Sequence, residues 1–155
     1  MSEIIAEKAN VISTPVKWEK TTFDSNDMWM AFQRGEEYQK DKENKEFEQT
    51  LSKNINKAAV LSENIFNTAI NDYGVNVYKA FLRADSLKNF DALFLVELKD
   101  YLSGKFKDIY TKSHLIKSEF NDNSFHISFK FMPNSDDVNL DCIYSDGYMF
   151  AYGKK

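Results

Sequence analysis

The chain has 155 residues, of which 43% are hydrophobic and 28% are charged, and its formal net charge is −4. These values are typical of one soluble globular domain, with or without an appended arm, that folds without a metal or a disulfide. The negative charge argues against a nucleic-acid binder that neutralises phosphates, and the single cysteine, Cys142, excludes an internal disulfide.

Residues 1–27 are predicted to form a loosely ordered N-terminal arm, because their apolar residues show no sustained period. Pro15 and the pair Thr21-Thr22 favour an extended chain. We expect at most one short strand here, near Val16-Lys17-Trp18.

Residues 28–57 are predicted to form a helical, highly charged extension. The N-cap residues at 24–27 precede it, and Gly35 weakens it by about 1 kcal/mol relative to alanine. Residues 36–48 are almost entirely charged or amide and have little to bury. The extension begins with an apolar cluster that is either an interface or a segment folded back on its own sheet: Met28, Trp29, Met30 and Phe32.

Residues 58–155 are predicted to form the main α+β domain. Apolar residues at spacings of three and four predict an amphipathic helix that ends near Gly74, packed on a sheet or, alternatively, in a coiled coil. These positions are Phe47, Leu51, Ile55, Ala58, Leu61, Ile65 and Ala69.

Two apolar runs then follow, at residues 75–82 and 92–98, separated by a polar link, and they indicate two buried strands. A helix over residues 87–102 is the alternative, with Leu87, Phe90, Phe94, Leu98 and Tyr101 on one face.

The last third of the chain continues with a helix favoured over a strand at residues 105–120. A strand at 124–132 has Phe125, Ile127, Phe129 and Phe131 on one face, and it is broken at Pro133. A short helix at 138–144 and a final strand at 148–152 complete the predicted order.

In order and spacing, residues 58–153 resemble the core of a minimal nucleotidyltransferase. Residues 77–80 correspond to the first strand of that family, Arg83-Ala84 to the pair that often follows its Gly-Ser motif, and residues 91–96 to its Asp-x-Asp strand. The resemblance implies a nucleotidyltransferase-like mixed sheet flanked by helices, with the N-terminal helical arm added.

The catalytic motifs of that family are missing. Phe81-Leu82 replaces the Gly-Ser pair, which lets the backbone approach a triphosphate, and Leu93 replaces the second metal-binding acid after Asp91. Because this chemistry depends on metal and positioning, the resemblance implies a member without catalytic activity. We expect no cofactor and no metal.

Arg83, Asp85 and Asp91 are candidates for a remnant pocket at the strand ends, although charged residues are common in such loops. Two functions remain open. The first is a non-catalytic binding or regulatory protein, antitoxin-like by resemblance, that binds a protein partner or itself through the N-terminal arm. The second is a divergent metal-dependent nucleotidyltransferase or nucleotide-binding protein.

The sequence shows no sign of export. The first ten residues lack the basic start and apolar core of a secretory signal, and no apolar run approaches the roughly 20 residues of a membrane helix. We therefore expect a cytoplasmic protein with neither a membrane nor a nucleic-acid partner.

Overall fold

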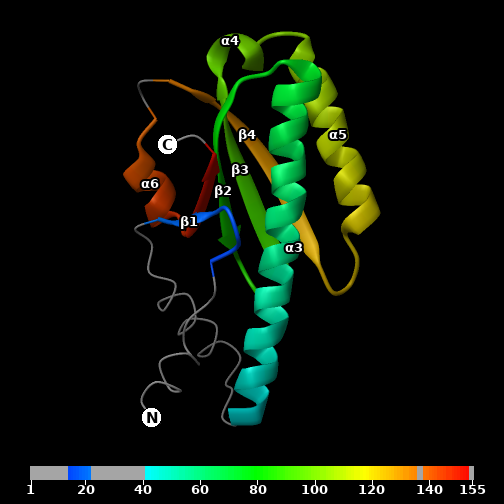
Figure 1. Ribbon diagram of the computed structural model, residues 1–155, viewed down its shortest axis with the longest axis vertical. Helices are drawn as coiled ribbons and strands as arrows, with labels where there is room; N and C mark the ends of the chain where they lie inside the picture. Colours follow the sequence, from blue (N-terminus) through cyan, green and yellow to red (C-terminus); the bar gives the residue numbers. More distant parts are fainter. Residues whose placement is uncertain (1–13, 22–40, 136–137, 154–155) are drawn as a thin grey trace.

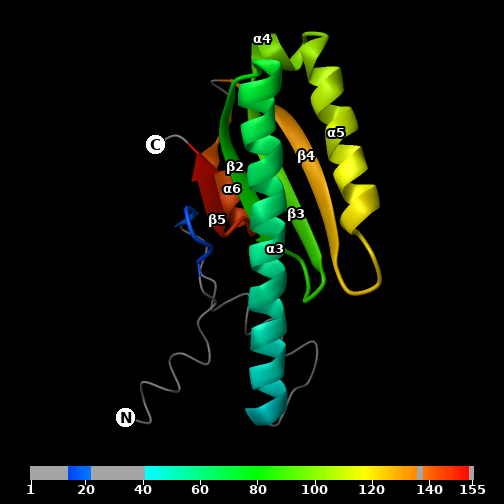
Figure 2. The same cartoon turned by 45° about the vertical axis from the view of Figure 1, so that its right-hand side comes forward.

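The computed structural model describes residues 14–21, 41–135 and 138–153. Within these ranges the strands form one five-stranded mixed sheet in the order β1-β5-β2-β3-β4, flanked by helices (Figures 1 and 2). The predicted α+β class is confirmed. The predicted interface cluster of Met28, Trp29, Met30 and Phe32 lies outside the described residues.

Helix α3 (Asp41–Tyr73) is the longest of the described elements and covers one face of the sheet. Its predicted stripe is confirmed from Leu51 to Ala69, where all six predicted positions are buried in the main core. The side chain of Phe47, the first predicted position, is outside the described part of the structure. The helix ends where Gly74 adopts a φ of 66°, and the Val75 amide donates to the Ala69 carbonyl at 2.9 Å. The sequence placed the boundary between the charged extension and the main domain after residue 57, but α3 continues across this point without a break. The described part of the extension, residues 41–57, is therefore the first half of α3.

Strands β2 (Val77–Ala84) and β3 (Asn89–Glu97) form an antiparallel hairpin. All residues of β3 from Phe90 to Val96 are buried, which explains why the strand is an apolar run rather than an alternation. The alternative helix over residues 87–102 is therefore wrong, and only α4 (Leu98–Tyr101) is helical there.

Helices α4 and α5 (Lys105–Phe120) connect β3 to β4 (His126–Asn134), which pairs parallel to β3. The favoured helix at 105–120 and the phenylalanine alternation of β4 are confirmed. The predicted break at Pro133 is wrong, because the strand continues to Asn134. As β4 is the outer strand of the described sheet, a proline there interrupts no ladder bond on its free side.

Helix α6 (Leu140–Ser145) and strand β5 (Phe150–Gly153) end the described chain. The Asn139 side chain caps α6 by accepting from the amides of Asp141 and Cys142, at 2.9 and 3.4 Å. The helix covers the sheet face opposite to α3 and α5 (Figure 1). A second, smaller apolar cluster fills that side: Phe81, Leu93, Leu95, Ile143, Tyr148 and Ala151.

The short strand β1 (Glu19–Lys20) pairs antiparallel with β5 and closes this edge of the sheet. The short strand expected near Val16-Lys17-Trp18 is present directly after these residues, which themselves form a turn: Lys17 has a φ of 76° and the Trp18 amide donates to the Pro15 carbonyl. Trp18 is only 5% exposed, its ring centroid lies 5.2 Å from that of Tyr152 in a tilted arrangement, and its indole N–H donates to Glu63 at 2.7 Å. This part of the arm is thus integral to the core rather than loosely ordered.

We predict that Trp18→Ala lowers the free energy of unfolding by about 3–5 kcal/mol, because it leaves a cavity at the β1–β5 edge and removes an indole hydrogen bond. Urea denaturation followed by circular dichroism measures this. Val16→Ala, at a side chain that is 81% exposed, is the control and changes stability by less than about 0.5 kcal/mol. Equal stability of the two variants would show that the arm is not part of the fold.

Among the described residues, no helix is both long enough and apolar enough to cross a bilayer.

Candidate functional site

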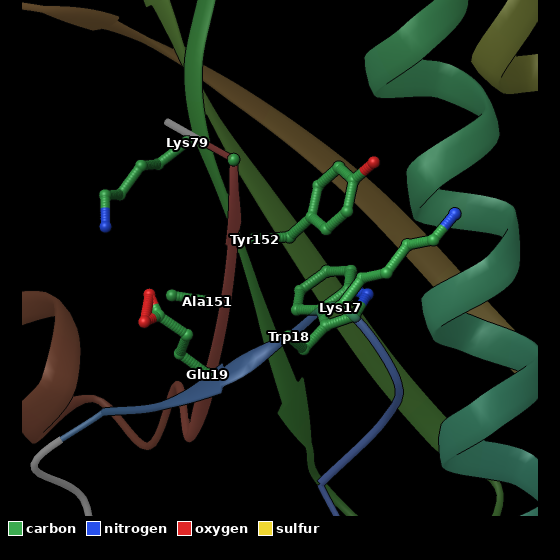
Figure 3. A pocket seen from close by; sticks show the side chains of 7 residues that line it. Lys17, Trp18, Glu19, Lys79, Ala151 and Tyr152 are labelled. Carbon is green, nitrogen blue, oxygen red and sulfur yellow. The ribbon is translucent and has the colours of Figure 1, made fainter. Parts of the chain in front are cut away.

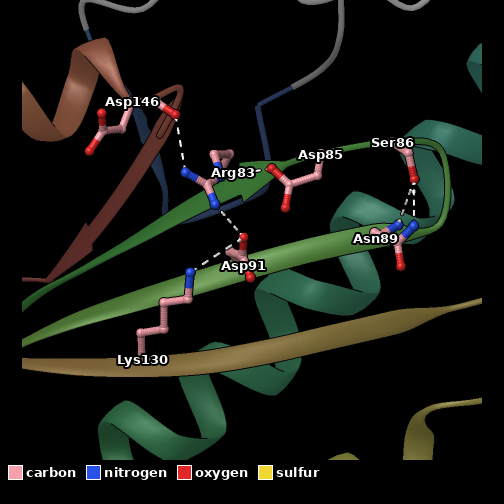
Figure 4. A network of polar contacts seen from close by, with 7 residues as sticks. All are labelled: Arg83, Asp85, Ser86, Asn89, Asp91, Lys130 and Asp146. Atoms are coloured by element: carbon pink, nitrogen blue, oxygen red, sulfur yellow. Dashed lines mark hydrogen bonds and ion pairs between the residues drawn. The ribbon is translucent and has the colours of Figure 1, made fainter.

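A row of polar side chains crosses the sheet on the α6 face. Arg83 on β2 is in register with Asp91 on β3, which is in register with Ser128 on β4. Asp85 follows at the end of β2, and Lys130 approaches Asp91 from β4 (Figure 4). The structure therefore brings together the three residues singled out from the sequence, Arg83, Asp85 and Asp91.

Arg83 is the centre of this polar cluster. Its Nε lies 2.8 Å from Asp85 Oδ1, its Nη2 pairs with Asp91 Oδ2, and its Nη1 donates to the Asp146 carbonyl at 3.2 Å. The guanidinium also lies over the ring of Tyr148, 4.8 Å from its centroid. One side chain thus ties the β2–β3 hairpin to the loop between α6 and β5.

Gly147 makes room for this tie. It has a φ of 102°, and a Cβ at this position would lie 3.2 Å from the Arg83 Cδ atom. The turn at Asp146-Gly147 therefore admits the arginine side chain as well as reversing the chain.

The two carboxyl groups of the cluster titrate at different pH. Burial, followed by the hydrogen bond and charge of Asp91, raises the pKa of Asp85 to about 6. Burial alone would also raise the pKa of Asp91, but hydrogen bonds from Asp85 and Arg83 and the charge of Lys130 outweigh it and lower that pKa. Asp91 is consequently the more strongly acidic carboxyl of the pair, and Asp85 takes up a proton as the pH falls below about 6.

The cluster is a poor place for metal or phosphate chemistry. Asp91 is only 8% exposed, and Arg83 and Lys130, the latter at 3.9 Å, already compensate its charge. No group of three or more histidine, cysteine or acidic side chains within the described ranges lies close enough to hold a metal ion. Ser128 stands beside Asp91 where a further acid would be needed.

The other transferase-like positions are part of the core. Phe81 is fully buried, Leu82 is 1% exposed, and Leu93 is 9% exposed. Phe81 and Leu93 pair across the hairpin and pack under α6 with Tyr148. These three side chains therefore serve the packing of the sheet.

A small cavity of about 240 Å³ lies at the β1–β5 edge (Figure 3). Lys79 and Glu19 approach it from one side of β5, whereas Trp18 and Tyr152 lie on the other. The lining side chains are thus divided between the two faces of the sheet. They do not converge on one point as a small-molecule site requires.

A larger groove of about 620 Å³ lies between α3 and α5, which run side by side in Figures 1 and 2. Leu61, Ile116 and Phe120 form its apolar floor, and Val60 on its wall is 62% exposed. Polar side chains complete the lining: Asn56, Lys57, Asn64, Lys112 and Glu119. An apolar channel bordered by polar groups is typical of a surface that binds another polypeptide.

Several of these residues were not found from the sequence. Lys130 was not singled out, and the roles of Asp146 and Tyr148 depend on contacts with Arg83, which lies 63 or more positions away. A signal for the groove did exist in α3, because Val60 is an apolar residue that lies off the buried stripe. Neither cavity is lined by Arg83, Asp85 or Asp91.

Comparison with known proteins found no matching family model, no matching curated protein and no matching solved structure. We therefore infer function from the side chains described above.

We predict that the Asp85 carboxyl titrates near pH 6 in carbon-13 NMR, about two units above its usual value of 3.8. Because the folded-state pKa is raised, Asp85 stabilises the fold below pH 3.8 and loses this contribution as the pH rises to about 6. Asp91→Asn should lower the Asp85 midpoint, because it removes the charge of Asp91 and leaves only burial to raise the pKa. A midpoint near 4 in the unmodified protein would contradict the raised pKa of Asp85.

We also predict that Arg83→Met destabilises the protein by about 2–3 kcal/mol, because it leaves Asp91 buried with only the distant Lys130. Arg83→Met combined with Asp91→Leu should recover at least half of this loss, since both partners are then apolar. Urea unfolding of the two single variants and the double variant gives the coupling energy. Purely additive effects would mean that the pair does not interact.

Proposed function

We propose that this protein acts by binding another protein, without catalysis, and that the α3–α5 groove is its binding surface. The observation that carries the proposal is Val60, an apolar side chain that is 62% exposed on the wall of an apolar groove. Exposing a valine beside Leu61, Ile116 and Phe120 costs favourable burial, and a docked partner would restore it.

The dimensions and lining favour an amphipathic helix as the bound element. Two helices that lie side by side, as α3 and α5 do, form a channel between them. A third helix can pack into such a channel through residues at spacings of three and four. The polar rim, with Lys57 on one helix and Lys112 on the other, would flank the polar edges of the ligand.

Strand addition to the sheet is less suitable as a binding mode. Within the described residues β4 is the outer strand, but the Asn121 side chain already bonds both the amide and the carbonyl of Ile127, at 2.9 and 3.1 Å. Pro133 lacks an amide hydrogen, and the exposed Lys130 adds a charge between them. These features are typical of an edge protected against pairing.

A degenerate nucleotidyltransferase-like domain with a regulatory, antitoxin-like role remains part of this proposal. It is supported by the sequence of elements from α3 to β5 and by the burial of Phe81, Leu82 and Leu93 at the positions that carry the family's catalytic motifs. Under this proposal an ancestral catalytic face is closed by α6, and the function lies on the helical face.

A divergent metal-dependent nucleotidyltransferase, or a nucleotide-binding protein, is the second candidate. The observation that favours it is the convergence of two carboxyl groups, those of Asp85 and Asp91, on the Arg83 guanidinium. Against it, a metal at this point would have to displace Arg83 from Asp91.

We predict that a photo-reactive amino acid at Val60 cross-links a defined protein in cells, whereas the same group at Leu102 does not. Leu102 is 74% exposed and does not line the groove, so it controls for accessibility. With the identified partner purified, Val60→Glu should weaken binding at least tenfold because it places a charge against the apolar floor.

The second candidate is tested on the same protein by a thermal shift with magnesium and a nucleoside triphosphate. The proposed function expects no change in melting temperature. Stabilisation that is abolished by Asp91→Asn would overturn it in favour of a nucleotide site.

A further inference from the structure

The charge of the groove indicates the kind of segment it accepts. Helix α5 contains four lysines and two acids, whereas the whole chain has a net charge of −4. Among the charged residues of the groove lining, Lys57 and Lys112 are basic and only Glu119 is acidic. Lys57 is positioned by the ring of Phe125, 4.4 Å from its centroid, which leaves a cation beside the apolar floor. An apolar segment with acidic flanks complements this surface.

The chain itself contains such a segment. Residues 28–32 comprise two methionines, a tryptophan, an alanine and a phenylalanine, and they lie between two pairs of acids: Asp24, Asp27, Glu36 and Glu37. Tryptophan and methionine are enriched at protein interfaces, where they supply large and adaptable apolar contacts. Residues 22–40 carry four acids and two basic residues, a net charge opposite in sign to that of α5.

The positions of the chain on either side favour binding in a second molecule. Thr21 is anchored to Tyr148 and Met149 beyond the sheet edge, and Figures 1 and 2 show β1 on one side of α3 with α5 on the other. The seven residues from Thr21 to Met28 span at most about 25 Å. Passing around α3, a cylinder roughly 10–12 Å across, takes up most of this length.

The segment between Phe32 and the start of α3 is also barely long enough for docking in the same molecule. Along the helix axis, Val60 lies about 28 Å from Asp41, since each residue rises 1.5 Å. The nine residues from Phe32 to Asp41 reach at most about 32 Å. Docking in the same molecule would therefore stretch both connections close to their limits, whereas docking in a second copy would not.

We propose that the α3–α5 groove binds residues 28–32 of a second copy of this chain. Two copies exchanging arms would form a twofold-symmetric dimer, in which each groove holds the arm of the other molecule. This inference rests on the proposed function, because it names the partner of the same groove.

Disulfide trapping tests the arrangement directly. In full-length chains that carry Cys142→Ser, which removes the only cysteine, Met30→Cys is placed in one tagged chain and Val60→Cys in another. Mild oxidation of the mixture should give a covalent dimer linked between positions 30 and 60, identified by peptide mass spectrometry. A Met30→Cys chain mixed with a Leu102→Cys chain is the matched control and should give at least tenfold less product.

Sedimentation of the cysteine-free parent supplies the independent measurement. It should show a concentration-dependent dimer, and Trp29→Ala or Val60→Lys should raise the dimer dissociation constant at least tenfold without changing the circular dichroism spectrum. A chain that remains monomeric at all concentrations, or one carrying both cysteines that links them only within one molecule, would overturn self-association.

Different results would contradict self-association and protein binding at the groove. If no link forms between positions 30 and 60 while the cross-linker at Val60 still captures another protein, self-association is wrong and the proposed function stands. If the cross-linker at Val60 captures neither a second copy nor another protein, the proposed function itself fails.

Discussion

The burial of β3 on both faces is the constraint on which the rest of the molecule depends. Helices α3 and α5 cover one face and α6 covers the other, so each side chain from Phe90 to Val96 must be apolar or compensated. Asp91 is the exception within this stretch. Its carboxylate explains the position of Arg83 opposite it in the hairpin and of Lys130 on the next strand. A charge buried under α6 thereby fixes how three strands and the last loop fit together.

The burial of β3 also leaves no space for a ligand on the sheet face that carries Asp91. Phe81 and Leu93 contact each other in register and pack beneath α6, so the sheet face that carries Asp91 is closed by the protein's own side chains. Arg83 forms ion pairs with Asp85 and Asp91, donates to the Asp146 carbonyl and places its flat face over Tyr148. An arginine engaged in this way is a structural tie, because releasing it toward a phosphate would leave a carboxylate uncompensated in a buried position.

Local patterns in the sequence were sufficient for most of the fold. The three-and-four spacing of Leu51, Ile55 and Ile65 predicted α3, and the alternation around Phe129 predicted β4, because in both the buried face has a regular period. Strand β1 is two residues long and has no period to detect. The burial of Trp18 depends on Glu63 and Tyr152, which are 45 and more positions away. For the same reason the sequence located Arg83, Asp85 and Asp91 but not their connection to Tyr148.

The groove lies on the outer surface of the helical layer, so binding there does not disturb the packing of the core. Five strands about 4.8 Å apart make a sheet roughly 20 Å wide, and two helices packed 8–10 Å apart cover it completely. The channel between α3 and α5 therefore opens on the outer surface of the helical layer rather than on the sheet. Its floor, Leu61 and Ile116, belongs to the core, whereas Val60 on the wall contributes little to it. A bound helix would form a further layer over these two helices and would leave the folded domain beneath it unchanged.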